Sequence, residues 1–205
     1  KPALINWAAK TEREMMLRLA EVAWGAGWQT FLESVPKGYA HTREKEKAGD
    51  IGSQAHARSE WEFKSERPEP KLEDKALWAF MAWQDWKNQS GLETLHVERV
   101  VYSQAYRYAG TLDWLGNMAA TSTLADWKTG RAIWPEALLQ NAAYVHAAIE
   151  MGLVKPPVQG CIVRLPKVET DPEFEVRLIP WEAQAELFQT FLAVLELWRW
   201  LEKQK

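Results

Sequence analysis

An acid and a lysine two positions apart, Asp126 and Lys128, are the residues best suited by type and spacing to do chemistry. They end a short apolar run typical of a β-strand, in which alternate residues share a face, so both side chains point away from Trp127. The carboxylate could hold a hard cation such as Mg²⁺. The ammonium could orient or deprotonate a water and stabilise charge on a phosphoryl group. Taken alone, the pattern also fits a charged strand face exposed to solvent.

Further candidate metal ligands lie upstream. Asp113 stands between two large apolar residues, where an unpaired charge is costly and a metal ion would remove that cost. His56 and Glu60 are four apart in a helical stretch and share a face, and a neutral imidazole is a common metal ligand. The alternatives are an Asp113 that caps a turn near Gly116, and a His–Glu pair on a solvated helix.

Gln140 and Tyr144, again four apart, place an amide and a phenol on one face of the helix that Pro135 is expected to open. Because this helix directly follows the strand of Asp126, the pair would lie near the strand ends. A partly buried polar pair in an alanine-rich helix is the alternative interpretation.

Hydrophobic periodicity assigns these residues to an ordered series of elements. We expect helices over 7–32, 43–63 and 72–87, strands over 95–102, 106–115 and 121–127 with a turn at Gly116-Asn117, a helix over 135–150, strands over 158–165 and 174–179, and a helix over 181–201. The order predicts a single α/β domain over residues 1–205. Its first 90 residues form a mainly helical section that carries His56, and residues 91–205 form the mixed sheet and a C-terminal helix.

The composition is that of an ordinary globular protein, with 205 residues, 47% apolar, and a net charge of −3. That charge argues against a protein that coats nucleic acid non-specifically, although a metal-dependent nuclease must itself gather carboxylates. No stretch approaches the ~18 apolar residues of a membrane span and no signal peptide opens the chain, so we expect no membrane association and a cytoplasmic setting. The chain begins with Lys1 rather than Met, which predicts a natural start further upstream.

Together the motifs form an ordered set: Gly52-x-x-x-His56-x-x-x-Glu60, Gly110-x-x-Asp113, Asp126-x-Lys128 and Gln140-x-x-x-Tyr144. Over roughly residues 49–165, this set resembles the RecB-type branch of the PD-(D/E)xK nuclease superfamily, which includes phage recombination exonucleases. The resemblance implies a restriction-endonuclease-like core, in which helices flank a central mixed β-sheet in the order αβββαβ. Several members carry four cysteines for an iron–sulfur cluster. Because this chain has only Cys161, it resembles the cluster-free, phage-type members.

The resemblance also implies the metal ligands and the catalytic lysine. His56, Asp113 and Asp126 would bind Mg²⁺ or Mn²⁺, with the backbone carbonyl of Trp127 completing the coordination sphere. Lys128 would be the catalytic lysine.

Other matched positions would support this centre. Gln140 and Tyr144 would brace the site and contact the DNA strand, and Arg131 would contact a phosphate. Glu60 would brace His56 or reach the metal through a water. Glu98, in the first strand, is a further supporting acid or else an exposed strand residue.

The expected activity is that of a Mg²⁺- or Mn²⁺-dependent deoxyribonuclease. We expect an exonuclease that acts on single- or double-stranded DNA ends in phage recombination or DNA repair, in a bacterial or phage-infected cell, with a recombination partner protein or as a homo-oligomer. Structure-specific and restriction-type endonucleases use the same core. A catalytically silent DNA-binding or scaffold protein is the alternative from another class.

Thirteen tryptophans are unusually many for this length. Most are expected to pack between helices or in the core, as at Trp83 and Trp86. The better candidates for stacking on DNA bases are Trp24, Trp28 and Trp61. Trp198 and Trp200 cannot share one narrow helix face, so one of the two is expected to be exposed and to mark an oligomer contact.

Overall fold

The computed structural model describes residues 40–65, 68–170 and 173–204. The chain divides into two units, Lys1–Asp50 and Ile51–Lys205, and all side chains discussed below belong to the second unit. The described helices and strands are α3 (Ala40–Lys64), α4 (Asp74–Ser90), β1 (Leu92–Ser103), β2 (Tyr108–Met118), β3 (Thr121–Thr129), α5 (Pro135–Glu150), β4 (Gln159–Leu165), β5 (Glu175–Ile179) and α6 (Trp181–Glu202). The predicted helix over 7–32, with Trp24 and Trp28, lies outside the described residues, and the single-domain prediction stays a prediction.

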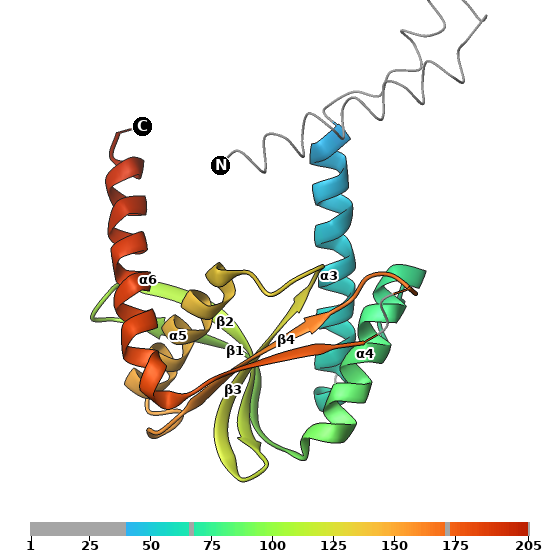
Figure 1. The fold of residues 1–205 in the computed structure, drawn as a ribbon, viewed down its shortest axis with the longest axis horizontal. Helices are drawn as coiled ribbons and strands as arrows, with labels where there is room; N and C mark the ends of the chain where they lie inside the picture. Colours follow the sequence, from blue (N-terminus) through green and yellow to red (C-terminus); the bar gives the residue numbers. More distant parts are fainter. Residues whose placement is uncertain (1–39, 66–67, 171–172, 205) are drawn as a thin grey trace, which may run out of the picture. The chain divides into compact units, whose positions relative to one another are not determined.

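The five strands form one mixed sheet in the order β1-β2-β3-β4-β5. Only β3 and β4 pair in parallel, and α5 makes the crossover between them. Figure 1 shows α3 and α4 on one side of the sheet and α5 and α6 on the other. The expected α/β class with a central mixed sheet and flanking helices is therefore confirmed, with most element ends within a few residues of their predicted positions.

Tryptophans fill the layer between the sheet and α4. Trp83 and Trp86 of α4 are fully buried, and their rings lie 5.9 and 5.5 Å from the ring of Trp127, centroid to centroid. This packing holds one face of β3 against α4. Because alternate residues of a strand face opposite ways, Asp126 and Lys128 are directed to the other face, where α5 lies. The predicted packing role of these two α4 tryptophans is confirmed.

The hairpin between β2 and β3 corrects one prediction. Gly116 and Asn117 lie within β2, paired with Thr123 and Ser122 of β3, and do not form the turn. The turn lies at Ala119-Ala120, whose φ angles are 48° and 64°. Two positive φ values usually select Asn or Gly, so an Ala-Ala turn carries no recognisable signal. Gly116 is required for packing instead, because a Cβ there would lie 2.2 Å from the carbonyl oxygen of Glu93.

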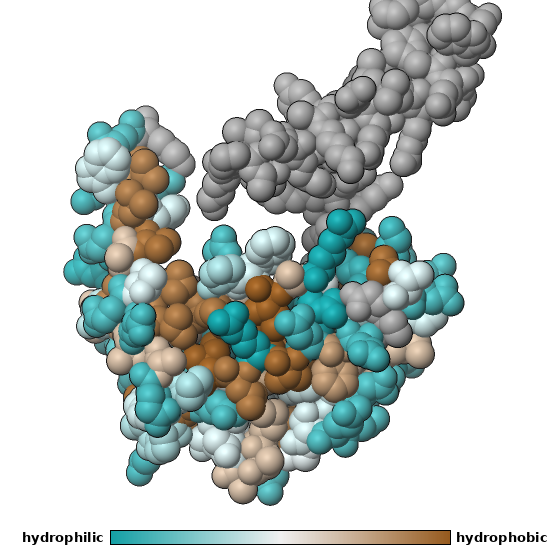
Figure 2. Space-filling view, in the orientation of Figure 1, coloured by the Kyte–Doolittle hydropathy of each residue, from teal (hydrophilic) through white to brown (hydrophobic). Residues whose placement is uncertain are grey.

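The C-terminal half of α6 carries an exposed apolar stripe, visible in Figure 2 as brown along the upright helix. Trp198 and Trp200 are 56% and 57% exposed, so both tryptophans face solvent where exposure of one was expected, and the expected oligomer contact stays a prediction. The helix is nevertheless anchored near its end, since the Arg199 guanidinium donates to the carbonyl oxygens of Tyr106 and Arg107 at 2.6 and 2.9 Å.

Among the helices that the structure describes, none combines the length and apolar character needed to cross a membrane.

Candidate functional site

The site lies where β2 and β3 stop pairing. Their register runs from the hairpin to Trp114 opposite Ala125. Beyond this pair, the backbone N–H of Trp127 in β3 donates to Oδ2 of Asp113 in β2 at 2.8 Å. A side-chain carboxylate thus replaces the next rung of the ladder, and Asp113 is held buried in the opening between the two strands.

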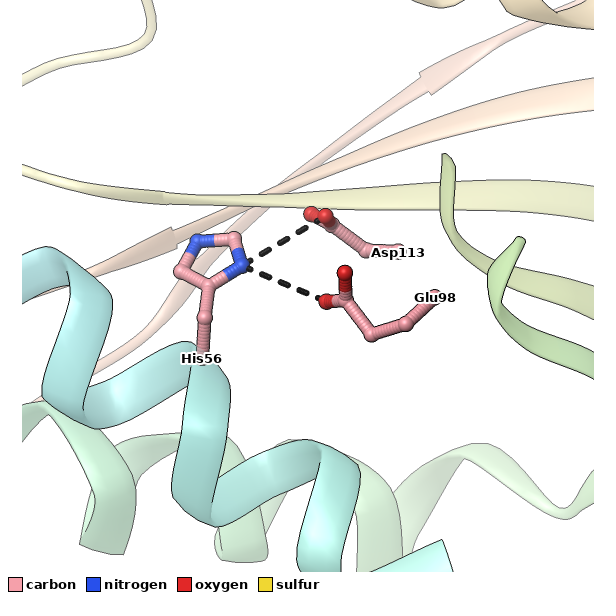
Figure 3. A group of neighbouring side chains, drawn as sticks. All are labelled: His56, Glu98 and Asp113. Atoms are coloured by element: carbon pink, nitrogen blue, oxygen red, sulfur yellow. Dashed lines mark ion pairs between the residues drawn. The ribbon is translucent and has the colours of Figure 1, made fainter. Parts of the chain in front are cut away.

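Three candidate metal ligands meet beside this opening. Nδ1 of His56 lies 3.4 Å from Oδ1 of Asp113 and 3.8 Å from Oε1 of Glu98. One ligand atom from each residue lies within 4.8 Å of the other two. Figure 3 shows the imidazole, carried by α3, pointing at carboxylates that come from β1 and β2. One nitrogen and two carboxylate oxygens at this spacing could hold a metal ion.

Glu98 reaches this group through an unusual backbone conformation. It lies in β1 opposite Asp113, between the pairs Val97–Trp114 and Arg99–Leu112, and its φ is 47°. A left-handed non-glycine residue inside a strand is strained and is found mainly where function requires it. Sequence reasoning placed Glu98 only as a supporting acid. No residue type at this position signals a left-handed backbone, so its place in the ligand group could not be predicted.

Close helix packing positions His56. A Cβ added to Gly52, one turn before His56, would lie 3.0 Å from the Thr129 hydroxyl at the end of β3. Ala55 beside it is fully buried. Small residues therefore let α3 approach the sheet closely enough for the imidazole to reach Asp113, which gives a physical reason for the Gly-x-x-x-His spacing.

Asp126 and Lys128 form the second part of the site. Lys128 Nζ lies 2.5 Å from Oδ2 of Asp126, and the lysine side chain is 33% exposed whereas the aspartate is 1% exposed. The lysine thus extends from a buried carboxylate to the surface. Asp126 is not a member of the three-residue ligand group. Its predicted role as a metal ligand stays a prediction, and in this structure it holds Lys128.

Negative charge dominates the electrostatics of the site. Burial, followed by the charge of Asp113, raises the pKa of Asp126, and Lys128 only partly offsets this. Burial alone would lower the pKa of His56, but hydrogen bonds and charge from Asp113 and Glu98 raise it to about 10. Burial also works against the Lys128 ammonium, yet Asp126 and Asp113 raise the pKa of that lysine. The carboxylates therefore favour bound positive charge, whether a proton or a metal ion.

The Gln140–Tyr144 pair forms as the spacing predicts. Gln140 Nε2 donates to the Tyr144 hydroxyl at 2.7 Å. A Cβ on Gly110 would lie 2.4 Å from the Tyr144 ring, so this glycine lets the phenol cross β2. Burial raises the pKa of Tyr144, the Gln140 hydrogen bond lowers it, and the charges of Asp126 and Lys128 act on it in opposite directions.

The remaining predicted residues lie around this centre. Glu60 accepts a hydrogen bond from Lys64 Nζ at 2.9 Å and is not part of the ligand group. Arg131 is exposed in the loop after β3. Because the N–H and C=O of one extended residue point to the same side, the Trp127 carbonyl faces the opening as its N–H does. That direction is compatible with its expected role as a ligand.

Cys161 and Trp61 lie outside the ligand group. Cys161 is fully buried, as expected for a small hydrophobic residue, and burial raises the pKa of its thiol to about 12. Trp61 stacks under the guanidinium of Arg58, whose central carbon lies 4.4 Å from the ring centroid. One face of Trp61 is thus occupied, which weakens it as a base-stacking candidate.

No protein-family model matches the chain, and no characterised protein matches it in sequence.

Proposed function

We propose that this protein is a divalent-metal-dependent DNA nuclease with a restriction-endonuclease-like core. The observation that carries the proposal is the position of Asp113. One of its carboxylate oxygens lies 3.4 Å from His56, and the other accepts the Trp127 N–H at 2.8 Å. Asp113 thereby links two features of the site. One is the group able to bind a metal ion, and the other is the strand segment that carries Asp126 and Lys128. Phosphodiester hydrolysis needs this combination.

The order of elements supports the same proposal. The helix that carries His56, α3, is followed by α4, three antiparallel strands, the crossover helix α5, and β4 parallel to β3. From α4 onward this is the αβββαβ order that the motif resemblance implies, with α3 as an additional helix before it. Motif segments from four elements also contact one another: Asp113 of β2 lies against His56 of α3 and the Trp127 N–H of β3, and Tyr144 of α5 packs over Gly110 of β2.

In this proposal His56, Glu98 and Asp113 hold Mg²⁺ or Mn²⁺. A bound ion of this kind polarises a phosphoryl oxygen and lowers the pKa of a coordinated water. Asp126 keeps the Lys128 ammonium close to the ligand group, where it can orient the attacking water and stabilise charge on the phosphoryl oxygens. Gln140 and Tyr144 then line the side of the site formed by α5, where the substrate strand would pass.

The test is cleavage of linear and circular, single- and double-stranded DNA with Mg²⁺ or Mn²⁺, and with EDTA as a control. We expect Asp113→Asn to abolish cleavage and Lys128→Ala to lower the rate by about 10²–10³-fold. Exposed residues of α4 supply matched controls, Asp85→Asn and Lys75→Ala, which should behave like the parent.

The form of DNA that is cleaved and the activity of Asp113→Asn relative to the parent decide between the candidate functions. Cleavage restricted to linear DNA would identify an exonuclease, and cleavage of circles would identify the endonuclease that the same core can support. No metal-dependent cleavage of any substrate by the folded parent, or equal activity of parent and Asp113→Asn, would sink the proposal. The first of these outcomes, combined with retained DNA binding, would favour a silent DNA-binding protein.

A further inference from the structure

Among the large hydrophobic side chains that the structure describes, Trp134 has the largest exposed fraction, 65%. It is the last residue before α5, with extended backbone at φ −87° and ψ 149°. The loop that carries it starts at the end of β3, after Thr129. Trp134 lies six residues after Lys128 and six residues before Gln140. Trp134 therefore stands midway along the chain between the two parts of the candidate site that the loop connects.

The loop is anchored at two places before this tryptophan. The Gly130 N–H donates to the Leu165 carbonyl oxygen at 3.0 Å, and the Gly130 carbonyl accepts from Arg164 at 3.4 Å. Ile133 packs against a buried cluster formed by α5, β4 and β5. The indole is thus presented to solvent by an anchored backbone, whereas a tryptophan needed for packing would be turned inward with its neighbour.

Charge accompanies the exposed ring. Arg131, in the same loop, is exposed and forms no hydrogen bond or ion pair with any other residue of the described chain. An aromatic face and a guanidinium carried by one exposed loop suit single-stranded nucleic acid, because bases stack on the ring while the cation contacts the backbone. The interior of a duplex offers no such base, since each base face is covered by its neighbours.

We propose that Trp134 stacks on an unpaired base of the strand being cut, and that the substrate is therefore single-stranded where it crosses this loop. The inference rests on the proposed nuclease function. Helix geometry places Trp134 about 9 Å from the level of Gln140 and about 15 Å from that of Tyr144 along α5. The stacked base therefore lies a few nucleotides from the cleaved bond.

This role is tested by the cleavage of end-labelled single strands with Mg²⁺ or Mn²⁺. The variants are Trp134→Ala and Trp134→Phe. The matched control is Trp200→Ala, which removes a 57% exposed tryptophan of α6. We expect Trp134→Ala to lower kcat/KM by about 5- to 150-fold, the loss of one base–aromatic stack. Trp134→Phe should retain most of the activity, and Trp200→Ala should match the parent. Circular dichroism confirms that each variant is folded.

An abasic nucleotide is next placed at each position of the substrate in turn, and the cleavage rate is measured. If Trp134 had only a structural role, the effect of the abasic nucleotide would not depend on the presence of this tryptophan. At one position, a few nucleotides from the cut, the abasic nucleotide should slow the parent by the same factor and leave Trp134→Ala unchanged. Equal cleavage by Trp134→Ala and parent, additive losses at every abasic position, or an altered sedimentation coefficient of Trp134→Ala would overturn the inference. A parent that cuts no DNA would instead refute the proposed function, so the two failures are distinguishable.

Discussion

Replacing Gly110 with alanine tests whether the Tyr144 phenol belongs to the working site. The added Cβ would lie 2.4 Å from Cε1 of Tyr144 and 2.7 Å from its hydroxyl oxygen. Because favourable carbon contacts lie at about 3.5–4.0 Å, the ring or the strand must move by about 1 Å. Overpacking of this kind costs about 1–3 kcal/mol where neither partner can move freely.

The ring is the part expected to move. Gly110 is paired with Val101 inside the β1–β2 ladder, whereas the clashing atoms are the far end of a side chain. Moving the ring breaks the 2.7 Å hydrogen bond from Gln140, worth about 0.5–1.5 kcal/mol. We therefore expect only a small fall in the free energy of unfolding but a loss of cleavage rate of about 100-fold, the effect of a ~1 Å misplacement at an active site.

Urea unfolding and metal-dependent DNA cleavage measure the two effects. Gly130→Ala is the matched control, because nothing lies within 4 Å of a Cβ there and its φ is not positive. In the double variant Gly110→Ala/Tyr144→Ala the clash is gone, so its activity should equal that of Tyr144→Ala alone. A Gly110→Ala enzyme as active as Gly130→Ala, or losses that add in the double variant, would refute the reasoning.

Three further predictions follow from the same contacts. Glu98→Gly should raise the free energy of unfolding by about 1 kcal/mol, because it relieves the left-handed backbone, while weakening Mn²⁺ binding measured by calorimetry. Mn²⁺ at one hundred times its Kd should add about 2.7 kcal/mol to the free energy of unfolding of the parent and so raise its Tm. The same Mn²⁺ concentration should not raise the Tm of His56→Ala. Glu150 accepts a 2.6 Å hydrogen bond from Ser103, which together with two backbone N–H groups lowers the pKa of the Glu150 carboxyl. Since its folded pKa is depressed, the stabilisation is present above the ordinary value of 4.5, and the stability gap between parent and Glu150→Gln in urea should close as the pH falls below it.

The part of the site set by local pattern was predictable. Alternation along β3 separates Trp127 from Asp126 and Lys128 because an indole and two charged groups demand opposite environments. The i, i+4 spacing of Gln140 and Tyr144 is likewise enough to bring the pair together on a helix. In each case the decisive physics acts between residues only a few positions apart.

Features that depend on distant backbone were not predictable. Glu98 enters the ligand group only because its backbone is left-handed at the position in β1 opposite Asp113. A glutamate in the sequence does not indicate that conformation. The Ala119-Ala120 turn is imposed by the pairing of β2 with β3, which places Gly116 inside a strand. The exposure of both Trp198 and Trp200 follows from how little of α6 packs against the sheet, which helical periodicity does not reveal.

Regular strand pairing is interrupted at Asp113 on both sides of β2. Toward β1, the pairs on either side of Glu98 are in register, but Glu98 and Asp113 themselves are not among the paired residues of the described ladder. Toward β3, pairing ends at Trp114, and the Asp113 carboxylate takes the Trp127 N–H in its place. Backbone strain and lost ladder bonds each destabilise a sheet, so their coincidence at one buried acid calls for a compensating interaction. A cation bridging His56, Glu98 and Asp113 would supply it. On this reasoning the interrupted pairing at Asp113 is what allows the His56 imidazole and the carboxylates of Asp113 and Glu98 to lie together.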